Sequence, residues 1–167
     1  MSKFMLVSIV IAGIALHAPQ AAYAQGLPAN APGDYLPEDI NWQPSPVLPG
    51  KVRIGAVVGD QTKPEPFVIR VKVPANTKIM PHTHPQDLVY TIISGVFYIG
   101  MGPTFDPQKL KAYPAGSVIV LPANAPHFHW AQSGEYVSQI SAVRGPRGLA
   151  YVNPTDDPRT QPSDQAK

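Results

Sequence analysis

Hydrophobic and polar residues alternate along short stretches of this chain. In residues 67–73 (FVIRVKV) every odd-numbered position is apolar, and two of the even-numbered positions are charged. Side chains of a strand project alternately to its two faces, so this pattern predicts a strand with one buried face. Further stretches are rich in β-favouring residues and are bounded by Gly, Pro or Asn: 51–59, 88–94, 96–101, 117–122, 127–131, 136–144 and 149–152.

About eight or nine short strands at even spacing are typical of a β-sandwich or small barrel of the jelly-roll kind. Only residues 106–113 (DPQKLKAY) are compatible with a helical turn. We therefore expect an all-β fold, with residues 51–153 forming a single domain.

Both flanks of this domain are interrupted by proline. Residues 25–50 contain Pro28, Pro32, Pro37, Pro44, Pro46 and Pro49. Each proline lacks a backbone donor and restricts the residue before it, so we expect an extended Pro-rich arm. Trp42 is expected to anchor this arm to the domain or to a second subunit. Residues 154–167 are polar and proline-broken, which predicts a flexible tail.

Residues 1–24 have the layout of a secretory signal peptide. Lys3 precedes an apolar run over residues 4–16, and Ala22, Tyr23 and Ala24 form a small-x-small cleavage site. The apolar run is shorter than the roughly 20 residues of a membrane-spanning helix. The alternative is an uncleaved N-terminal anchor. Cleavage would yield a periplasmic or secreted protein with no membrane attachment.

Composition limits the chemistry that is open to this chain. It has 13 Lys and Arg against 11 Asp and Glu, and the basic residues form no cluster, so no nucleic-acid partner is expected. It has no cysteine, which excludes disulfides and thiolate metal ligands. Any metal must therefore be bound by nitrogen and oxygen.

The histidines are clustered. Apart from His17, they form two H-x-H pairs, His82/His84 and His127/His129. Residues i and i+2 of a strand project to the same face, so each pair can direct two imidazoles to one point. Two strands facing each other inside a barrel would bring the pairs together. We expect a divalent transition metal (Fe, Zn, Mn, Ni or Cu), although an H-x-H pair is also found as an ordinary surface feature.

Both pairs lie in segments that resemble the two signature motifs of the cupin superfamily. The matching positions are His82, His84 and Gly95 in residues 81–95, and Gly116, Pro122 and His127 in residues 114–131. Asn124 stands where the family has glycine, and Asn tolerates the left-handed backbone conformation. The similarity extends from about Trp42 to the C-terminal tail. It is closest to small exported single-domain cupins of uncertain function and implies a single cupin jelly-roll barrel.

The resemblance implies His82, His84 and His127 as metal ligands, but the glutamate ligand of the family is replaced by Leu88. Three histidines with a water is one arrangement that this departure leaves open. Such a site leaves the charge of the metal uncompensated by protein, which favours a bound water of lowered pKa or an anionic ligand.

Three residues are alternatives for the fourth ligand. His129 shares a face with His127, and it is also a candidate for a hydrogen-bonding role behind the ligands. Asp87 is adjacent to Leu88, which stands at the position of the family glutamate, so its side chain could replace that ligand only if the backbone bulges. Gln86 would have to reach the metal from a loop. Leu88, at the position of the family glutamate, and Tyr90, two residues further along the strand, face the same side and are expected to line the cavity.

Two functions are consistent with these residues. Known cupin dioxygenases use three-histidine sites, so one is a metal-dependent oxygenase acting on a small anionic or chelating substrate. The other is a non-catalytic small-molecule binding or sensing protein with a structural metal, which Leu88 and the lack of a second catalytic group favour. The resemblance also implies a homodimer. Phe128 and Trp130, opposite the histidine face, are expected to pack against the neighbouring subunit.

Overall fold

The computed structural model describes residues 34–61, 63–142 and 148–160. The expected signal peptide and the first part of the arm lie outside these residues. The described chain folds into two antiparallel sheets. The predicted all-β jelly-roll fold is confirmed.

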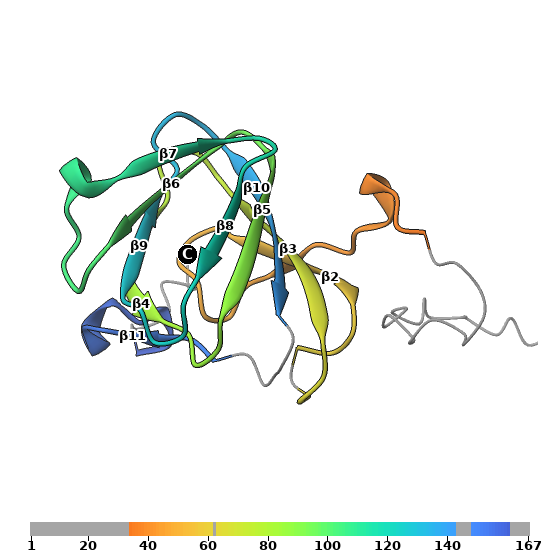
Figure 1. Ribbon diagram of the computed structural model, residues 1–167, viewed down its shortest axis with the longest axis horizontal. Coiled ribbons are helices and arrows are strands. Elements are labelled where there is room, and N and C mark those ends of the chain that lie inside the picture. The colour runs from red at the N-terminus through yellow and green to blue at the C-terminus, as the bar shows by residue number, and fades with distance from the viewer. Residues whose placement is uncertain (1–33, 62, 143–147, 161–167) are drawn as a thin grey trace, which may run out of the picture.

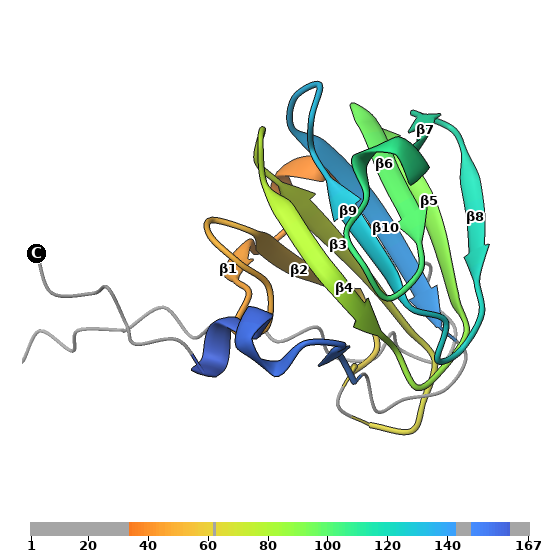
Figure 2. The ribbon, with the colours of Figure 1, turned by 90° about the vertical axis from the view of Figure 1, so that its left-hand side faces the viewer.

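The larger sheet has six strands. Their spatial order is β1 (Gln43–Pro44), β2 (Arg53–Val58), β3 (Phe67–Val73), β10 (Tyr136–Ala142), β5 (Leu88–Ser94) and β8 (Val118–Leu121). The smaller sheet has five strands, in the order β11 (Ala150–Tyr151), β4 (Lys78–Thr83), β9 (His127–Trp130), β6 (Val96–Met101) and β7 (Lys111–Pro114). The smaller sheet lies to the left of the larger one in Figure 1, and Figure 2 shows the strands of the larger sheet spread from β1 on the left to β8 on the right. β1 and β7 were not among the strands expected from sequence, and β4 was expected only as the strand that carries His82 and His84.

The core lies between the two sheets. The odd-numbered residues of β3 are at most 5% exposed, as the alternation in this stretch predicts. They share one apolar cluster with Phe97 and Ile99 of the smaller sheet. Burial of this apolar surface is the main favourable contribution to folding, at roughly 25 cal/mol per Å². The same core supports the walls of the site described below.

The part of the arm that is described enters the larger sheet through β1, which pairs with β2. Its most buried residues are Ile40 and Leu48. A Cβ on Gly55 would overlap the Ile40 side chain, so the glycine makes room for this contact. The expected anchor, Trp42, is only half-buried and lies under the Lys72 ammonium, 4.5 Å from the ring centroid. Aliphatic residues therefore bury more of the arm than the tryptophan does.

The outer face of the smaller sheet is covered from within the same chain. Phe128 is completely buried, and its ring lies 5.0 Å from that of Phe105 and directly over Gly100, where a Cβ would collide with it. Trp130 is half-buried beside Lys78, whose ammonium lies 4.9 Å from its ring centroid. The expectation that Phe128 packs against a second subunit is wrong, because residues of its own chain already fill that space.

Short 3₁₀ turns occupy part of the segment expected to form a helical turn and part of the expected flexible tail. Within residues 106–113, only η2 (Pro107–Lys109) is helical, and the Asp106 side chain caps it by accepting the backbone N–H of Gln108. At the C-terminal end, η3 (Pro154–Asp156) and η4 (Pro158–Thr160) follow β11, so ordered structure continues into the expected tail. Residues 161–167 lie outside the described chain. Among the described residues, no helix has the length and hydrophobicity that crossing a membrane requires.

Candidate metal centre

A β-bulge in β4 turns His82 towards the barrel interior. Ile79 pairs with His129 and His82 pairs with His127, so Met80 and Pro81 together oppose the single residue Phe128. Without the extra residue, Ile79 and His82 would face opposite sides of the sheet, because their separation is odd. With it, both are buried, at 2% and 1% exposed.

The two histidine pairs come from neighbouring strands of one sheet. β4 and β9 are hydrogen-bonded antiparallel partners, and His82 and His127 are directly opposite each other. The expectation that facing strands would bring the pairs together is therefore wrong. Cross-strand neighbours have Cβ atoms about 4.5–5.5 Å apart, which is close enough for two imidazoles to share one ion.

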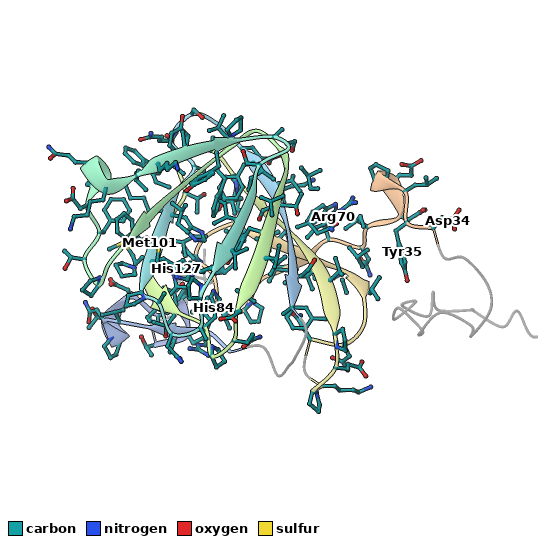
Figure 3. The ribbon with its side chains drawn as sticks, viewed as in Figure 1. Asp34, Tyr35, Arg70, His84, Met101 and His127 are labelled. Atoms are coloured by element: carbon teal, nitrogen blue, oxygen red, sulfur yellow. The ribbon has the colours of Figure 1, made fainter. Side chains whose placement is uncertain are left out.

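The four imidazoles form a single cluster. The His82 centroid lies 4.2 Å from that of His127, 5.1 Å from that of His84 and 5.3 Å from that of His129. The ligand atoms of His82, His127 and His129 lie within 4.8 Å of one another, so these three could hold a metal ion. His84 is outside this tightest group, although its centroid is 5.3 Å from that of His127, and Figure 3 shows the two side by side, away from Asp34 and Tyr35 of the arm.

Backbone carbonyls fix the orientation of three of the rings. The Nδ1 atoms of His82, His84 and His127 lie 2.8–2.9 Å from the carbonyl oxygens of Met80, Gly148 and Ala125. A carbonyl only accepts, so each Nδ1 carries the hydrogen and each Nε2 carries the lone pair. Metal-binding histidines are held in the same way, by a hydrogen bond from the ring nitrogen that does not bind the metal.

Burial keeps His127 and His129 neutral at physiological pH. It lowers the pKa of His127 to about 4, against the opposing effect of the Ala125 carbonyl. Burial also lowers the pKa of His129 well below its ordinary value, and the neighbouring imidazoles act in the same direction. Neutral imidazole is the form that binds metals, so protons compete little for these two rings.

The Nε2 atoms of His127 and His129 are buried without a hydrogen-bond partner in the described part of the chain. A buried polar atom left in this state costs about 1–3 kcal/mol. A cation bound between the rings would supply the missing interaction for both lone pairs. The residues present therefore fit a transition metal with nitrogen ligands.

Hydrogen bonds tie together the loops that follow β4 and precede β9. Asn124 has a φ of 58°, the left-handed conformation expected where the family has glycine. Its backbone N–H donates to the His84 carbonyl at 2.7 Å. The Asp87 carboxylate is exposed and accepts the Ala123 N–H at 2.7 Å. Asp87 thus joins two loops and is not brought to the histidines.

Gln86 also stays apart from the histidine cluster. It is half-buried, and its amide nitrogen is enclosed without a partner among the described residues, but it does not line the cavity beside the cluster. Of the alternatives for a fourth ligand, the structure brings only His129 to the other histidines.

A small cavity opens between the histidines and the larger sheet. Leu88 and Tyr90 line it, as their parity predicts. Its volume is about 30 Å³, which is enough for about two water molecules. Its full lining is Leu48, Val71, Ile79, His82, His84, Leu88, Tyr90, His129, Tyr136, Ser138, Ile140 and Leu149. Most of these side chains are apolar, so the site is shielded from bulk water.

Tyr136 and Ser138 are lining residues that sequence reasoning did not identify. Both lie on the inner face of β10, where every second residue is buried. The signal was the alternation in residues 136–142, which places a tyrosine and a serine in register with Ile140 and Ala142.

Comparisons with known proteins bear on the fold. No family model and no curated protein matches the chain. Among solved structures, the polyketide cyclase RemF from Streptomyces resistomycificus is similar over 77% of this chain and 91% of its own, with a TM-score of 0.61 and 14% identity. A cupin-like protein from Thermotoga maritima matches over 70% of this chain and 89% of its own, with a TM-score of 0.54 and 19% identity.

The DMSP lyase DddQ from Ruegeria pomeroyi matches over 68% of this chain, with a TM-score of 0.53 and 15% identity, and the match covers 61% of that lyase. At these identities the likeness establishes the fold and not the activity. The chain has the cupin fold.

Proposed function

We propose that this chain, with its cupin fold, binds a divalent transition metal through its four clustered histidines and thereby binds and converts a small anionic or chelating molecule. The observation that carries the proposal is the orientation of the rings. Three Nδ1 atoms face backbone carbonyls, and the Nε2 atoms of His127 and His129 are enclosed without a partner among the described residues.

His82 and His127 are the ligands that the geometry favours most. Each belongs to the tightest group of ligand atoms, and each is oriented by a backbone carbonyl. His129 is a further ligand because it belongs to the same group of ligand atoms. His84 is a further ligand because the Gly148 carbonyl orients its ring in the same way. An all-imidazole set suits Fe, Zn, Ni or Cu better than Mn, which prefers oxygen ligands.

The ligand is expected to be small and anionic because imidazole binds a metal in its neutral form and brings no negative charge. None of the described residues that line the cavity has a carboxylate, so no side chain among them offsets the charge of a divalent ion. A metal held there would polarise an oxygen atom of the bound molecule or lower the pKa of a bound water. The apolar lining would exclude bulk water and strengthen both effects.

Oxygenase chemistry is the reaction that we propose to test first, on small diketones, thiols and flavonols. Proteins of this fold include a polyketide cyclase and a DMSP lyase, so the fold itself does not select the reaction. Dioxygen consumption by the metal-loaded protein across this panel would identify an oxygenase.

A non-catalytic binding or sensing protein is the second candidate. Leu88, buried at the position of the family carboxylate, supports it, as does the lack of a carboxylate in the cavity lining. Metal that stays firmly bound without dioxygen consumption or any other turnover, together with ligand binding, would favour this candidate.

Both candidate functions require a metal ion bound by the histidines, and the metal content of the purified protein tests this requirement. Purified wild-type protein should contain about one metal ion per chain, and His82→Ala and His127→Ala should lose it. Thr83→Ala, next to His82 but on the other face of β4, is the matched control. A correctly folded His82→Ala protein that retains its metal would contradict the proposal.

Export and dimerisation are part of the same proposal. They rest on the layout of residues 1–24 and on the resemblance to exported cupins. The intact mass of protein recovered from the periplasm or medium should correspond to a chain that begins at Gln25. Light scattering should give twice the mass of one chain.

A further inference from the structure

Three residues with hydroxyl groups, Tyr90, Tyr136 and Ser138, lie on the wall of the cavity formed by the larger sheet, whereas the histidines lie on the smaller one. Tyr136 and Ser138 are two residues apart on β10 and therefore share its inner face. Each is 1% exposed, and both line the same cavity as His82, His84 and His129. The space between the two sheets is thus bounded by imidazoles on one side and by hydroxyls on the other.

The hydroxyl groups of Tyr136 and Ser138 form no hydrogen bond with any residue in the described part of the chain. Around them the larger sheet contributes the aliphatic residues Val71, Leu88 and Ile140 and the neighbouring Tyr90. Buried hydroxyls are nearly always satisfied, and an ordered water or a ligand in the cavity would satisfy these two.

A structural role does not explain these residues. Ser138 is paired with Val71 and Ile92, both core residues, at a position where an alanine or valine would pack without an unsatisfied polar atom. The Tyr136 ring contributes to the core through an edge contact with Phe97 at 5.1 Å, which a phenylalanine would make equally well. The hydroxyl groups themselves therefore add nothing to the packing.

Tyr136 is a neutral donor at this position. Burial, together with the neighbouring Tyr90, raises its pKa well above the ordinary value, so the phenol keeps its proton. Among the described residues, no lysine or arginine lines the cavity. This wall accordingly suits a neutral acceptor, such as a hydroxyl or keto oxygen, and disfavours a second carboxylate.

We propose that the Tyr136 and Ser138 hydroxyls form a second binding subsite, which recognises the end of the ligand remote from the metal. The ligand would be a short hydroxy- or oxo-monocarboxylate: one anionic end at the histidine-held metal, a short apolar body against Leu88 and Ile140, and one neutral oxygen at the hydroxyls. This inference rests on the proposed function, since it takes the histidine cluster as the metal end.

The test compares two acids that differ by one hydroxyl, 3-hydroxybutyrate and butyrate, as ligands of the zinc-loaded full-length protein. Calorimetry should show that wild-type protein binds 3-hydroxybutyrate about tenfold more tightly than butyrate, since the extra oxygen satisfies two buried donors. In Tyr136→Phe and in Ser138→Ala this preference should fall to about threefold or less, and in the double variant it should vanish.

Two controls accompany these variants. Tyr98→Phe and Ser141→Ala remove the same groups from half-buried residues on the outer faces of β6 and β10. Both should keep the tenfold preference. Zinc content should be unchanged in every variant, and the melting temperature of Ser138→Ala should equal or exceed that of wild type, which a structural serine would not allow.

The outcomes separate the two proposals. A wild-type protein that holds no metal overturns the proposed function and this inference with it. A zinc-loaded wild type that binds neither acid, or both equally, overturns the inference alone. So does a preference for 3-hydroxybutyrate that survives in the double variant.

Discussion

His82 and His127 are directly opposite each other on the antiparallel strands β4 and β9, and their ring centroids lie 4.2 Å apart. Each ring is oriented by the carbonyl oxygen two residues before it in the chain, that of Met80 or of Ala125. The two segments thus contain the same arrangement of a histidine and the carbonyl oxygen two residues earlier, and they lie opposite each other in one sheet. The remaining histidines extend this pair into the four-ring cluster.

Asn124 should be replaceable by glycine but not by alanine. Its φ of 58° is readily adopted by glycine and is strained for a residue with an ordinary Cβ. We expect Asn124→Ala to lower the free energy of unfolding by about 1 kcal/mol and Asn124→Gly to change it by less than about half of that. Urea denaturation of the metal-free proteins measures both. Equal stability of the two variants would contradict the role assigned to the left-handed turn.

Removal of the Asp87 carboxylate should lower the free energy of unfolding and leave the metal content unchanged. The carboxylate accepts the Ala123 N–H, which ties the two histidine loops together. We expect Asp87→Ala to lower the free energy of unfolding by about 1 kcal/mol, because that N–H loses its acceptor, while the metal content stays that of wild type. Asp106→Ala removes a comparable loop carboxylate that caps η2, far along the chain from the histidines, and serves as the control. If Asp87→Ala lost its metal and Asp106→Ala kept it, Asp87 would be a metal ligand after all.

The metal-free protein should lose stability as the pH falls from about 6.5 to about 4. Burial lowers the pKa of His127 to about 4 in the folded chain, whereas in the unfolded chain it titrates near 6.5. Between these values the unfolded chain binds a proton that the folded chain does not, so acid favours unfolding. His129, whose pKa is also lowered by burial, acts in the same direction.

This contribution is fully present above pH 6.5 and disappears as the pH falls through about 4. We expect His127 to account for about 3 kcal/mol of the drop in the free energy of unfolding over that window. Urea titrations at several pH values measure it, with His127→Asn as the comparison. A wild-type profile no steeper than that of the variant would show that His127 does not titrate as its burial requires.

The local sequence pattern was sufficient to predict the strands that form the core. It was also sufficient to predict most of the histidine cluster. The alternation in residues 67–73 and the i, i+2 spacing of each histidine pair depend only on strand geometry, and both hold in the structure. The left-handed turn at Asn124 was likewise predicted from its place in the motif.

Features set by partner strands could not be predicted in this way. The bulge at Met80 and Pro81 interrupts the alternation, so β4 has no period-2 pattern of its own. Which strand lies beside β4 depends on pairings between residues distant in sequence. The burial of Ile40 over Gly55 and the open hydroxyls of Tyr136 and Ser138 likewise depend on which residues the fold brings against them.

X-ray absorption at the zinc edge, recorded on zinc-loaded wild-type protein, tests the central claim most directly. The account predicts a first shell that includes nitrogen at about 2.0–2.1 Å with the outer-shell scattering of at least three imidazole rings. Replacement of His127 by alanine should remove one ring from this signal or abolish zinc binding. A wild-type spectrum with oxygen neighbours and no imidazole scattering would show that the histidines of β4 and β9 do not share an ion.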